Sequence, residues 1–415
     1  MIHTKRTHCR ACGEERLRPF LELGPQPLAN AFLKSPAEFA AEQRYPLDVY
    51  FCEECALVQL ADVIDPEVLF RNYIYVTGTS KTIAEHNVRY AATVTKLLEL
   101  KPTDLVVEVA SNDGSLLKCF QAHGVRTLGV EPASNIAAMA REKGVETIDW
   151  FFNAATAAKV RASHGPARAV IGNNVLAHVD DTRDFLAGAA ALIAEDGLVI
   201  TEVPYLGEFM DHLEYDTVYH EHLCYFSVSA LMRLAEAVGL SIIRVDKVPV
   251  HGGSIRMYAG PVARHHGHAA EVRALAGEER RQGLTSLARF ERFGAEVAEN
   301  RRAVLALLTR LKGEGKRIAA YGAPAKGNTL LNYCGITTDL IPYTVDRNPM
   351  KVGTYAPGSH IPVRPYEGTY EAERPDYIVI LPWNFAEEIM QQPNERRFHD
   401  EGGRFIVPIP TPRIV

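Results

Sequence analysis

The sequence has no apolar run long enough to cross a membrane and no excess of basic residues. A membrane helix needs about 20 consecutive apolar residues, and no such stretch occurs in the 415 residues. The N-terminal segment also lacks the apolar core of a signal peptide. The formal net charge of −6 argues against a nucleic-acid-binding protein, which needs basic residues to neutralise phosphates. We therefore expect a cytoplasmic protein, a monomer or weak dimer, that binds neither membranes nor nucleic acid.

Cysteine is scarce but unevenly placed, because four of the seven cysteines form two C-x-x-C pairs. In a reducing compartment such pairs are more typical of metal ligands than of disulfides. Each turn can direct two thiolates at one ion, and two turns complete the tetrahedral coordination of zinc. Four protein ligands leave no open position, so we expect a structural zinc ion; four unliganded cysteines are the alternative. The expected ligands are Cys9, Cys12, Cys52 and Cys55.

Three regions of the chain differ in their residue patterns. Residues 1–70 are rich in proline, cysteine and turn residues, with only short apolar segments. Residues 71–262 alternate strand patterns with helical patterns, which predicts a parallel sheet covered on both faces. Residues 263–415 contain a long amphipathic helix at 278–313 and then a second, smaller α/β alternation. In the central region we expect strands at 105–110, 126–132, 167–173 and 198–204, helices at 116–124, 135–144, 184–197 and 227–239, and an antiparallel pair at 242–248 and 254–260.

A turn of small residues follows the first expected strand, and it lacks the G-x-G-x-x-G pattern of dinucleotide enzymes. Glu108 and Asp113 bring negative charge to the place where a pyrophosphate would lie, whereas a cationic sulfonium with an ammonium group tolerates carboxylates. Glu131 ends the next strand, where an acid can accept hydrogen bonds from ribose hydroxyls. These features favour S-adenosylmethionine over NAD; a turn that binds nothing is the alternative. The candidate cofactor-binding residues are Glu108, Ala110, Ser111, Asn112, Asp113, Gly114, Glu131 and Asn174.

Titratable side chains are concentrated in the segment 216–227, which contains Tyr219, His220, Glu221 and His222. A metal site is one interpretation, although ligands at positions i and i+2 seldom converge. Acid–base chemistry is another, because a histidine can remove a proton next to a carbonyl and a tyrosine can stabilise the enolate oxygen. The third interpretation is that the histidines only form structural hydrogen bonds in a polar crevice.

The region after residue 313 contains a second strand-to-helix turn, Tyr321 to Thr329, which carries Lys326 and no acid. A cation at a helix N-terminus suits a phosphate, so this turn predicts recognition of a diphosphate or nucleotide. A duplicated domain that keeps only the fold is the alternative. The candidate substrate-binding residues are Lys326, Asn328, Arg347 and His251, of which the last lies in a segment that either lines the same cleft or turns the chain.

Together these motifs resemble the sugar C-methyltransferases of deoxysugar biosynthesis, and most closely the 3-C-methyltransferases that act on thymidine-diphosphate 4-keto-deoxysugars. The motifs are E-V-A-S-N-D-G, G-V-E-P, N-N-V-x-A-H, Y-H-E-H-x-x-Y-F-S, H-G-G-S-I-R and Y-G-A-P-A-K-G-N-T, with both C-x-x-C pairs. The resemblance implies a zinc-binding domain at 1–70, a class I, Rossmann-like methyltransferase domain at 71–262, and a similar C-terminal domain at 263–415 without its own cofactor. It implies that a nucleotide-diphosphate keto-deoxysugar lies between the outer domains. It also implies His222 as the base, supported by Tyr219, Glu221, His178 and Tyr73.

Three other functions remain open on the sequence. A small-molecule O- or N-methyltransferase would use the same cofactor but would not need the paired histidine and tyrosine. A zinc-ribbon nucleic-acid modifier would need a basic face. An NAD-dependent sugar oxidoreductase would be supported by a G-x-G-x-x-G turn, which is missing.

Overall fold

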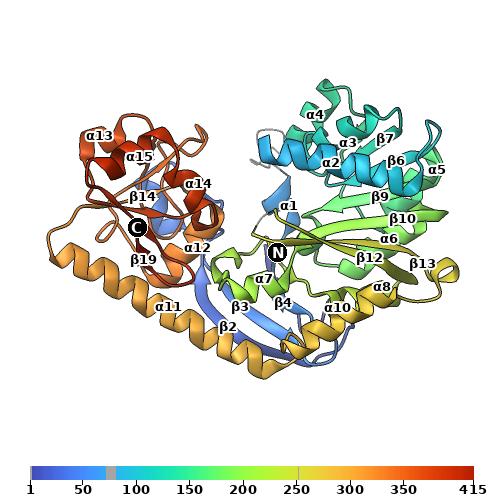
Figure 1. Cartoon of the computed structure of the whole chain (residues 1–415), viewed down its shortest axis with the longest axis horizontal. Helices are drawn as coiled ribbons and strands as arrows, with labels where there is room; N and C mark the ends of the chain where they lie inside the picture. Colours follow the sequence, from blue (N-terminus) through green and yellow to red (C-terminus); the bar gives the residue numbers. More distant parts are fainter. Residues whose placement is uncertain (1, 72–80, 251) are drawn as a thin grey trace.

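The computed structural model describes residues 2–71, 81–250 and 252–415. The expected site residues Tyr73 and His251 lie outside these ranges. The described residues form sheets of two, four, seven and six strands. In Figure 1 the C-terminal sheet lies on one side and the seven-stranded sheet on the other, with N-terminal strands between them and the long helix α11 running beneath. Within the described residues, no helix combines the length and apolarity that a membrane span requires.

The N-terminal part is a small antiparallel β structure. Its four-stranded sheet has the order β11-β4-β3-β2, and the strand β11 comes from the central part of the chain. Antiparallel pairing joins Cys224 to Gln59 and Tyr225 to Val58, so the two parts share a sheet. The elements are β1 His3–Lys5, β2 Leu17–Gln26, η1 Pro36–Ala41, β3 Tyr45–Cys52, β4 Val58–Leu60, β5 Asp62–Ile64, α1 Pro66–Phe70 and, from the central part, β11 Cys224–Tyr225.

The central part is an open α/β sheet with the strand order β12-β13-β10-β9-β6-β7-β8. The five strands from β10 to β8 are parallel to their neighbours, and β13 is antiparallel to both β10 and β12. This confirms the expected Rossmann-like sheet and its antiparallel edge pair. The strands are β6 Leu105–Val109, β7 Arg126–Val130, β8 Thr147–Ile148, β9 Ala167–Asn173, β10 Ile193–Pro204, β12 Leu240–Val248 and β13 Ser254–Pro261. The helices are α2 Lys81–Leu98, α3 Ser115–Gln121, α4 Ser134–Glu142, α5 Ala154–His164, η3 Leu176–His178, α6 Thr182–Leu192, α7 Leu206–Asp211, η4 Tyr215–Thr217 and α8 Val228–Ala237.

Two helix predictions were wrong at their ends. The helix expected at 184–197 ends at Leu192, because Ile193 already pairs with Ala167 of β9 and a bulge precedes Leu198. The helix expected to begin at 278 is split between α10 Ala270–Arg281 and α11 Leu287–Gly313. Gly283 breaks it with a φ of +83°, a left-handed conformation that suits glycine.

The C-terminal part is a second, smaller α/β sheet, as expected. Its strand order is β16-β15-β14-β17-β18-β19, parallel except for the last pair. The long helix α11 ties it to the N-terminal sheet, because Phe290 packs on Phe20 and Phe51 with ring centroids 5.0 and 4.8 Å away. The elements are α9 Val262–His265, β14 Ile318–Tyr321, α12 Ala325–Cys334, β15 Thr344–Asp346, β16 Val363–Pro365, α13 Thr369–Glu373, β17 Tyr377–Ile380, η5 Trp383–Phe385, α14 Ala386–Met390, α15 Pro393–Asp400, β18 Arg404–Val407 and β19 Arg413–Ile414.

Candidate active site

A cavity of about 660 Å³ lies where the three parts of the chain meet. The N-terminal part lines it with residues between Val63 and Phe70, and the C-terminal part with Lys326, Pro382 and neighbouring residues. The central part contributes the carboxyl ends of β6, β7, β9 and β10. Ligands of open α/β sheets collect at this edge, so the cavity is the candidate active site.

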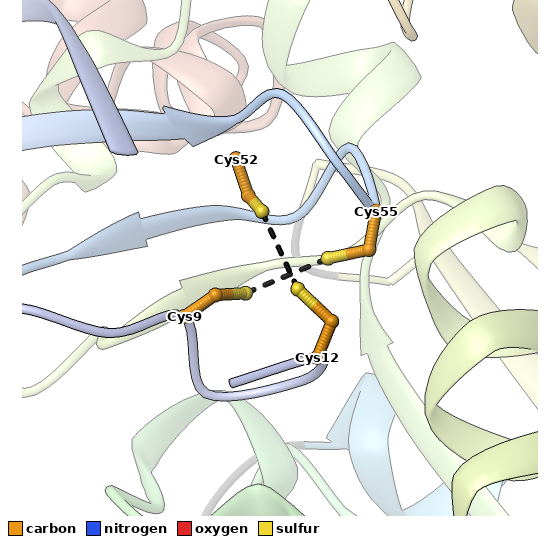
Figure 2. Close-up of side chains that lie close together, drawn as sticks. All are labelled: Cys9, Cys12, Cys52 and Cys55. Carbon is orange, nitrogen blue, oxygen red and sulfur yellow. Dashed lines mark hydrogen bonds between the residues drawn. The ribbon is translucent and has the colours of Figure 1, made fainter. Parts of the chain in front are cut away.

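The four expected cysteine ligands converge on one point (Figure 2). The Sγ atoms of Cys9 and Cys55 are 3.5 Å apart, and those of Cys12 and Cys52 are 3.6 Å apart. Tetrahedral zinc with Zn–S bonds of about 2.3 Å places its sulfurs about 3.8 Å apart, so the cluster fits this ion. Among the described residues no other group of three or more histidine, cysteine or acidic side chains is arranged for a metal. The Tyr-His-Glu-His segment does not belong to such a group within the described ranges.

The cofactor loop is held in a strained conformation beside the cavity. Glu108, Ala110, Ser111 and Asn112 line the cavity, and Ala110 and Asn112 have φ values of +52° and +49°. The carboxylate of Glu131 stabilises the turn, since it accepts hydrogen bonds from the backbone N–H groups of Asn112 and Ala133, both at 2.8 Å. Non-glycine residues with positive φ cost free energy and concentrate at ligand sites. This loop and Glu131 are thus built to meet a ligand.

Asp113 and Gly114 do not line this cavity, contrary to expectation. The Asp113 carboxylate bonds instead to the Lys143 ammonium group and to the Ser115 hydroxyl, the latter at 2.7 Å. Burial raises the pKa of this carboxyl, but these bonds outweigh burial and lower the pKa below its ordinary value. Gly114 is the N-cap of α3 with a φ of +74°, and an added Cβ would collide with Val145.

Glu108 is the acidic residue of the loop that lines the cavity. It is buried, and burial, aided by the charges of Glu131 and Asp113, raises its pKa well above the ordinary value. A cation bound beside it would restore the carboxylate, because an opposite charge favours the ionised form. The sign of this site therefore suits a ligand with an ammonium or sulfonium group.

Polar atoms on the cavity wall that lack a hydrogen-bond partner indicate whether S-adenosylmethionine fits in the cavity. Buried polar groups in proteins are normally hydrogen-bonded, yet several on the cavity wall have no partner among the described residues. The apolar side chains Phe151, Phe152 and Phe185 line the same cavity. A ligand with an aromatic base, hydroxyls and an amino-acid end fits this combination. The unsatisfied atoms are Asn87 Nδ2, Glu108 Oε2, Ser111 Oγ, Asn173 Oδ1, Asn174 Oδ1, His178 Nδ1 and Asn384 Oδ1.

A buried charge cluster at the end of β10 was missed in the sequence. Glu202 accepts hydrogen bonds from Arg256 Nε and Nη2 at 2.9 and 2.7 Å, and its Oε1 lies 3.1 Å from His86 Nε2. Burial raises the pKa of Glu202, but these two partners outweigh burial and lower it. An acid inside the strand pattern L-V-I-T-E-V-P was the available signal. His86 gave none, because α2 was not foreseen.

The expected base and its neighbours meet on the cavity wall. Nδ1 of His222 lies 2.7 Å from the carbonyl oxygen of Thr217. The ring of His222 has its centroid 3.9 Å from that of Tyr219 and 4.9 Å from that of His178. All three side chains line the cavity. Burial lowers the pKa of His178 to about 4, so its ring is neutral near pH 7.

Neither Glu221 nor His220 lines the cavity. The Glu221 carboxylate, which does not line this cavity, accepts a 2.7 Å hydrogen bond from Asn30 Nδ2 of the N-terminal part. The His222 ring is oriented by the Thr217 carbonyl. His220 is buried with its Nε2 3.1 Å from the carbonyl of Pro46, a packing role.

Of the expected substrate-binding residues, only Lys326 lines the cavity among those described. Its ammonium group lies 4.5 Å from the centroid of the Trp383 ring. Contrary to expectation, Asn328 is buried and donates a 2.8 Å hydrogen bond to the carbonyl of Ala29. Arg347 is exposed and stacks on Tyr366 at 4.1 Å. Neither residue lines the cavity.

Lys326 also has acidic neighbours that the sequence did not reveal. Glu214 and the buried Asp216 both belong to the central part, and the Lys326 charge acts on both. Burial raises the pKa of both carboxyls, to about 7 for Glu214, although Lys326 opposes this. Asp216 also accepts a 2.7 Å hydrogen bond from Trp383 Nε1. The C-terminal loop and the central part thus meet where Lys326 lies near the carboxyl groups of Glu214 and Asp216.

An open α/β sheet with an acidic, non-pyrophosphate cofactor turn, joined to a four-cysteine domain, defines a zinc-containing S-adenosylmethionine-dependent methyltransferase. Three family models match the chain: "Putative zinc binding domain" at 9–70, "Methyltransferase domain" at 83–245 and "C-methyltransferase C-terminal domain" at 249–410. The chain is 39% identical to C-methyltransferase NovU of Streptomyces niveus over 407 residues, which cover 98% of this chain and 96% of the relative. The chain therefore belongs to the C-methyltransferase family that includes NovU.

Likenesses to solved structures are more distant. Magnesium protoporphyrin IX methyltransferase from Synechocystis PCC 6803 is 14% identical, with a TM-score of 0.34, and covers 48% of this chain and 97% of its own. The CcbJ methyltransferase from Streptomyces caelestis is 14% identical, with a TM-score of 0.34, and covers 42% of this chain and 89% of its own. The family assignment rests on NovU and the three family models. It argues against transfer to oxygen or nitrogen.

Proposed function

We propose that the chain methylates a carbon next to the 4-keto group of a nucleotide-diphosphate deoxysugar, with His222 as the base. The observation that carries this proposal is the contact between His222 Nδ1 and the Thr217 carbonyl. A carbonyl only accepts hydrogen bonds, so Nδ1 holds the ring proton and Nε2 holds the basic lone pair. Proton removal next to a ketone needs such a base, whereas methylation of a hydroxyl or amine makes a smaller demand.

The chemistry can be written for the residues on the cavity wall. Nε2 of His222 takes the proton from the carbon next to the ketone, and the electron pair of the broken C–H bond forms the enolate. The Thr217 carbonyl stabilises the resulting imidazolium through Nδ1–H. The Tyr219 hydroxyl and the neutral His178 ring are the proposed hydrogen-bonding partners of the enolate oxygen.

Glu108, Glu131, Ser111 and Asn174 are the residues that would hold S-adenosylmethionine. When bound, it supplies an electrophilic methyl group on a positively charged sulfur, which the nucleophilic carbon attacks. Enclosure by the apolar side chains on the cavity wall excludes water, which strengthens the electrostatic stabilisation of the enolate.

The substrate proposal rests on Lys326 and on the size of the cavity. A nucleotide-linked sugar needs one cationic contact for its diphosphate, and Lys326 is the candidate on the C-terminal side. Carbons 3 and 5 both flank a 4-keto group, and we propose C3. Incubation with methyl-labelled S-adenosylmethionine and a thymidine-diphosphate 4-keto-6-deoxysugar, followed by NMR of the product, tests this. A methyl group on C5 would contradict the position, and one on oxygen would contradict the enolate chemistry.

A further inference from the structure

The metal-binding knuckle, which is the turn formed by residues 9–12, contacts the loop that carries His178. Arg10 stands between two of the zinc ligands, and its side chain is fully buried. Its Nε and Nη2 atoms each lie 3.2 Å from Oδ1 of Asp180. Asp180 follows His178 by two residues and lines the active-site cavity. A buried guanidinium group needs a paired partner, so this ion pair fixes the end of the His178 loop against the knuckle.

Gln59 ties Arg10 to the metal site itself. Its Oε1 accepts hydrogen bonds from the Arg10 backbone N–H at 3.1 Å and from Nη1 at 3.2 Å. Its Nε2 donates to Sγ of Cys9 at 3.2 Å. The position of the guanidinium group therefore depends on the same side chain that contacts a zinc ligand.

A second connection runs through the backbone of Leu223, the residue after His222. Its N–H donates to the carbonyl of Ala177 at 2.7 Å, and its carbonyl accepts from Leu60 N–H at 2.9 Å. Ala177 precedes His178, and Leu60 ends β4 of the zinc-binding sheet. One residue, Leu223, thus joins both histidine segments to the strand that follows the second C-x-x-C pair.

We propose that the four-cysteine domain positions the two active-site histidines, and that Arg10 is the side chain that transmits this. The inference rests on the proposed function, because it assumes that the His178–His222 pair acts on the substrate. The cofactor turn is built separately, from the ends of β6 and β7 with Glu131. Disturbing Arg10 should therefore slow proton removal and leave cofactor binding intact. Arg10 is a positioning residue, because it acts through Asp180 and not on the substrate.

The test uses Arg10→Gln and Asp180→Asn in the full chain. Arg10→Gln removes the cation of the ion pair, and Asp180→Asn removes its anion together with the 3.0 Å contact of Asp180 with Arg6. Arg18→Gln is the matched control, since Arg18 belongs to the same domain but pairs with Glu53 at the surface. Zinc content, binding of S-adenosylhomocysteine, kcat, KM and the ring NMR signals of labelled histidines are measured for each. We expect full zinc content, unchanged cofactor affinity and a kcat lower by about 10- to 100-fold. The signals of His178 and His222 should shift, and Arg10→Lys should restore part of kcat.

Several results would overturn the inference. Full kcat in Arg10→Gln with zinc retained would do so, as would equal losses of kcat and cofactor affinity. If Arg10→Gln loses zinc, Asp180→Asn becomes the deciding variant. Unchanged kcat and unchanged histidine NMR signals in Asp180→Asn would then contradict the inference. A different result would contradict the proposed function: a His222→Gln variant that still exchanges the substrate proton with solvent.

Discussion

Nδ1 of His222 lies 2.7 Å from the carbonyl oxygen of Thr217, and this contact decides which ring nitrogen can act as a base. The carbonyl holds the proton on Nδ1, so the lone pair is on Nε2. The rings of Tyr219 and His178 lie against the same imidazole, with centroids 3.9 and 4.9 Å away. The proposed base and the two side chains proposed to bind the enolate oxygen thus lie together at one wall of the cavity.

Loss of one zinc ligand should destabilise the protein more than loss of a cysteine elsewhere. Structural zinc contributes directly to folding free energy, so Cys9→Ser should lower the zinc content and the free energy of unfolding by several kcal/mol. Cys119→Ser is the control, because Cys119 lies on α3 outside the cluster. Metal analysis and thermal unfolding measure both effects. Equal melting temperatures and full zinc content in Cys9→Ser would show that the cluster does not hold the ion.

Cofactor affinity should depend on Glu131 and not on Asp113. Glu131 organises the turn with both of its oxygens, so Glu131→Gln should weaken binding of S-adenosylhomocysteine by about 10-fold or more, the equivalent of one charged hydrogen bond. Asp113→Asn should reduce stability through the loss of its Lys143 pair and leave affinity almost unchanged. Titration calorimetry compares the variants. A larger loss of affinity in Asp113→Asn than in Glu131→Gln would show that Asp113 belongs to the binding site.

The sequence predicted the layers of the fold better than the direction of individual side chains. Buried strand patterns and the glycines Gly124 and Gly144, which follow α3 and α4 with positive φ, located most of the central sheet. The C-x-x-C spacing identified the metal cluster because both turns are local. Helix α2 was not foreseen, and with it His86 and Asn87 were missed on the cavity wall.

The remaining errors concern tertiary contacts that spacing cannot show. Asp113 belongs to a loop motif, yet Lys143, 30 residues away in sequence, turns it from the cavity. Asn328 bonds to Ala29 across nearly 300 residues, and Glu221 bonds to Asn30 across 191. Motif membership placed Asp113 in the turn after β6, Asn328 in the helix after β14, and Glu221 in the segment before β11. Contacts with residues distant in sequence, Lys143 for Asp113 and the N-terminal part for Asn328 and Glu221, decided where each side chain points.

The stability of the protein should depend on pH through Glu221. Burial raises the pKa of Glu221 to about 7 from an ordinary value of 4.5, although the Asn30 hydrogen bond opposes this. The folded state then holds a proton that the unfolded chain releases, so the free energy of unfolding falls as pH rises from about 4.5 to about 7. Glu221→Gln keeps the acceptor oxygen and has no proton to lose. Relative to the wild type, it should gain stability on the order of 3 kcal/mol across this window.

Denaturant unfolding of both proteins at several pH values measures the Glu221 effect. The difference between the two profiles isolates this residue, because other buried groups contribute equally to both. Parallel profiles would mean that Glu221 titrates near its ordinary pKa.

Removal of the Lys326 charge should weaken substrate binding more than turnover. Lys326→Ala should raise KM for the nucleotide sugar by about 10-fold, as expected for loss of a charge-assisted contact to phosphate, with a smaller change in kcat. Lys316→Ala is the control, because Lys316 is exposed in the same domain and lies outside the lining of the active-site cavity. Steady-state kinetics with saturating S-adenosylmethionine give both constants. An unchanged KM in Lys326→Ala would remove the diphosphate contact from the proposal.

Exchange of the substrate proton with deuterated water tests the central claim most directly. In the presence of S-adenosylhomocysteine, which cannot donate a methyl group, wild-type enzyme should exchange the C–H next to the ketone, as followed by NMR of the nucleotide sugar. His222→Gln should lower this rate by about 10²- to 10⁴-fold, the usual contribution of a general base. His123→Gln, an exposed histidine of the same domain, should exchange at the wild-type rate. Exchange that persists in His222→Gln would contradict the account and move the base to another residue, with His178 the first to examine.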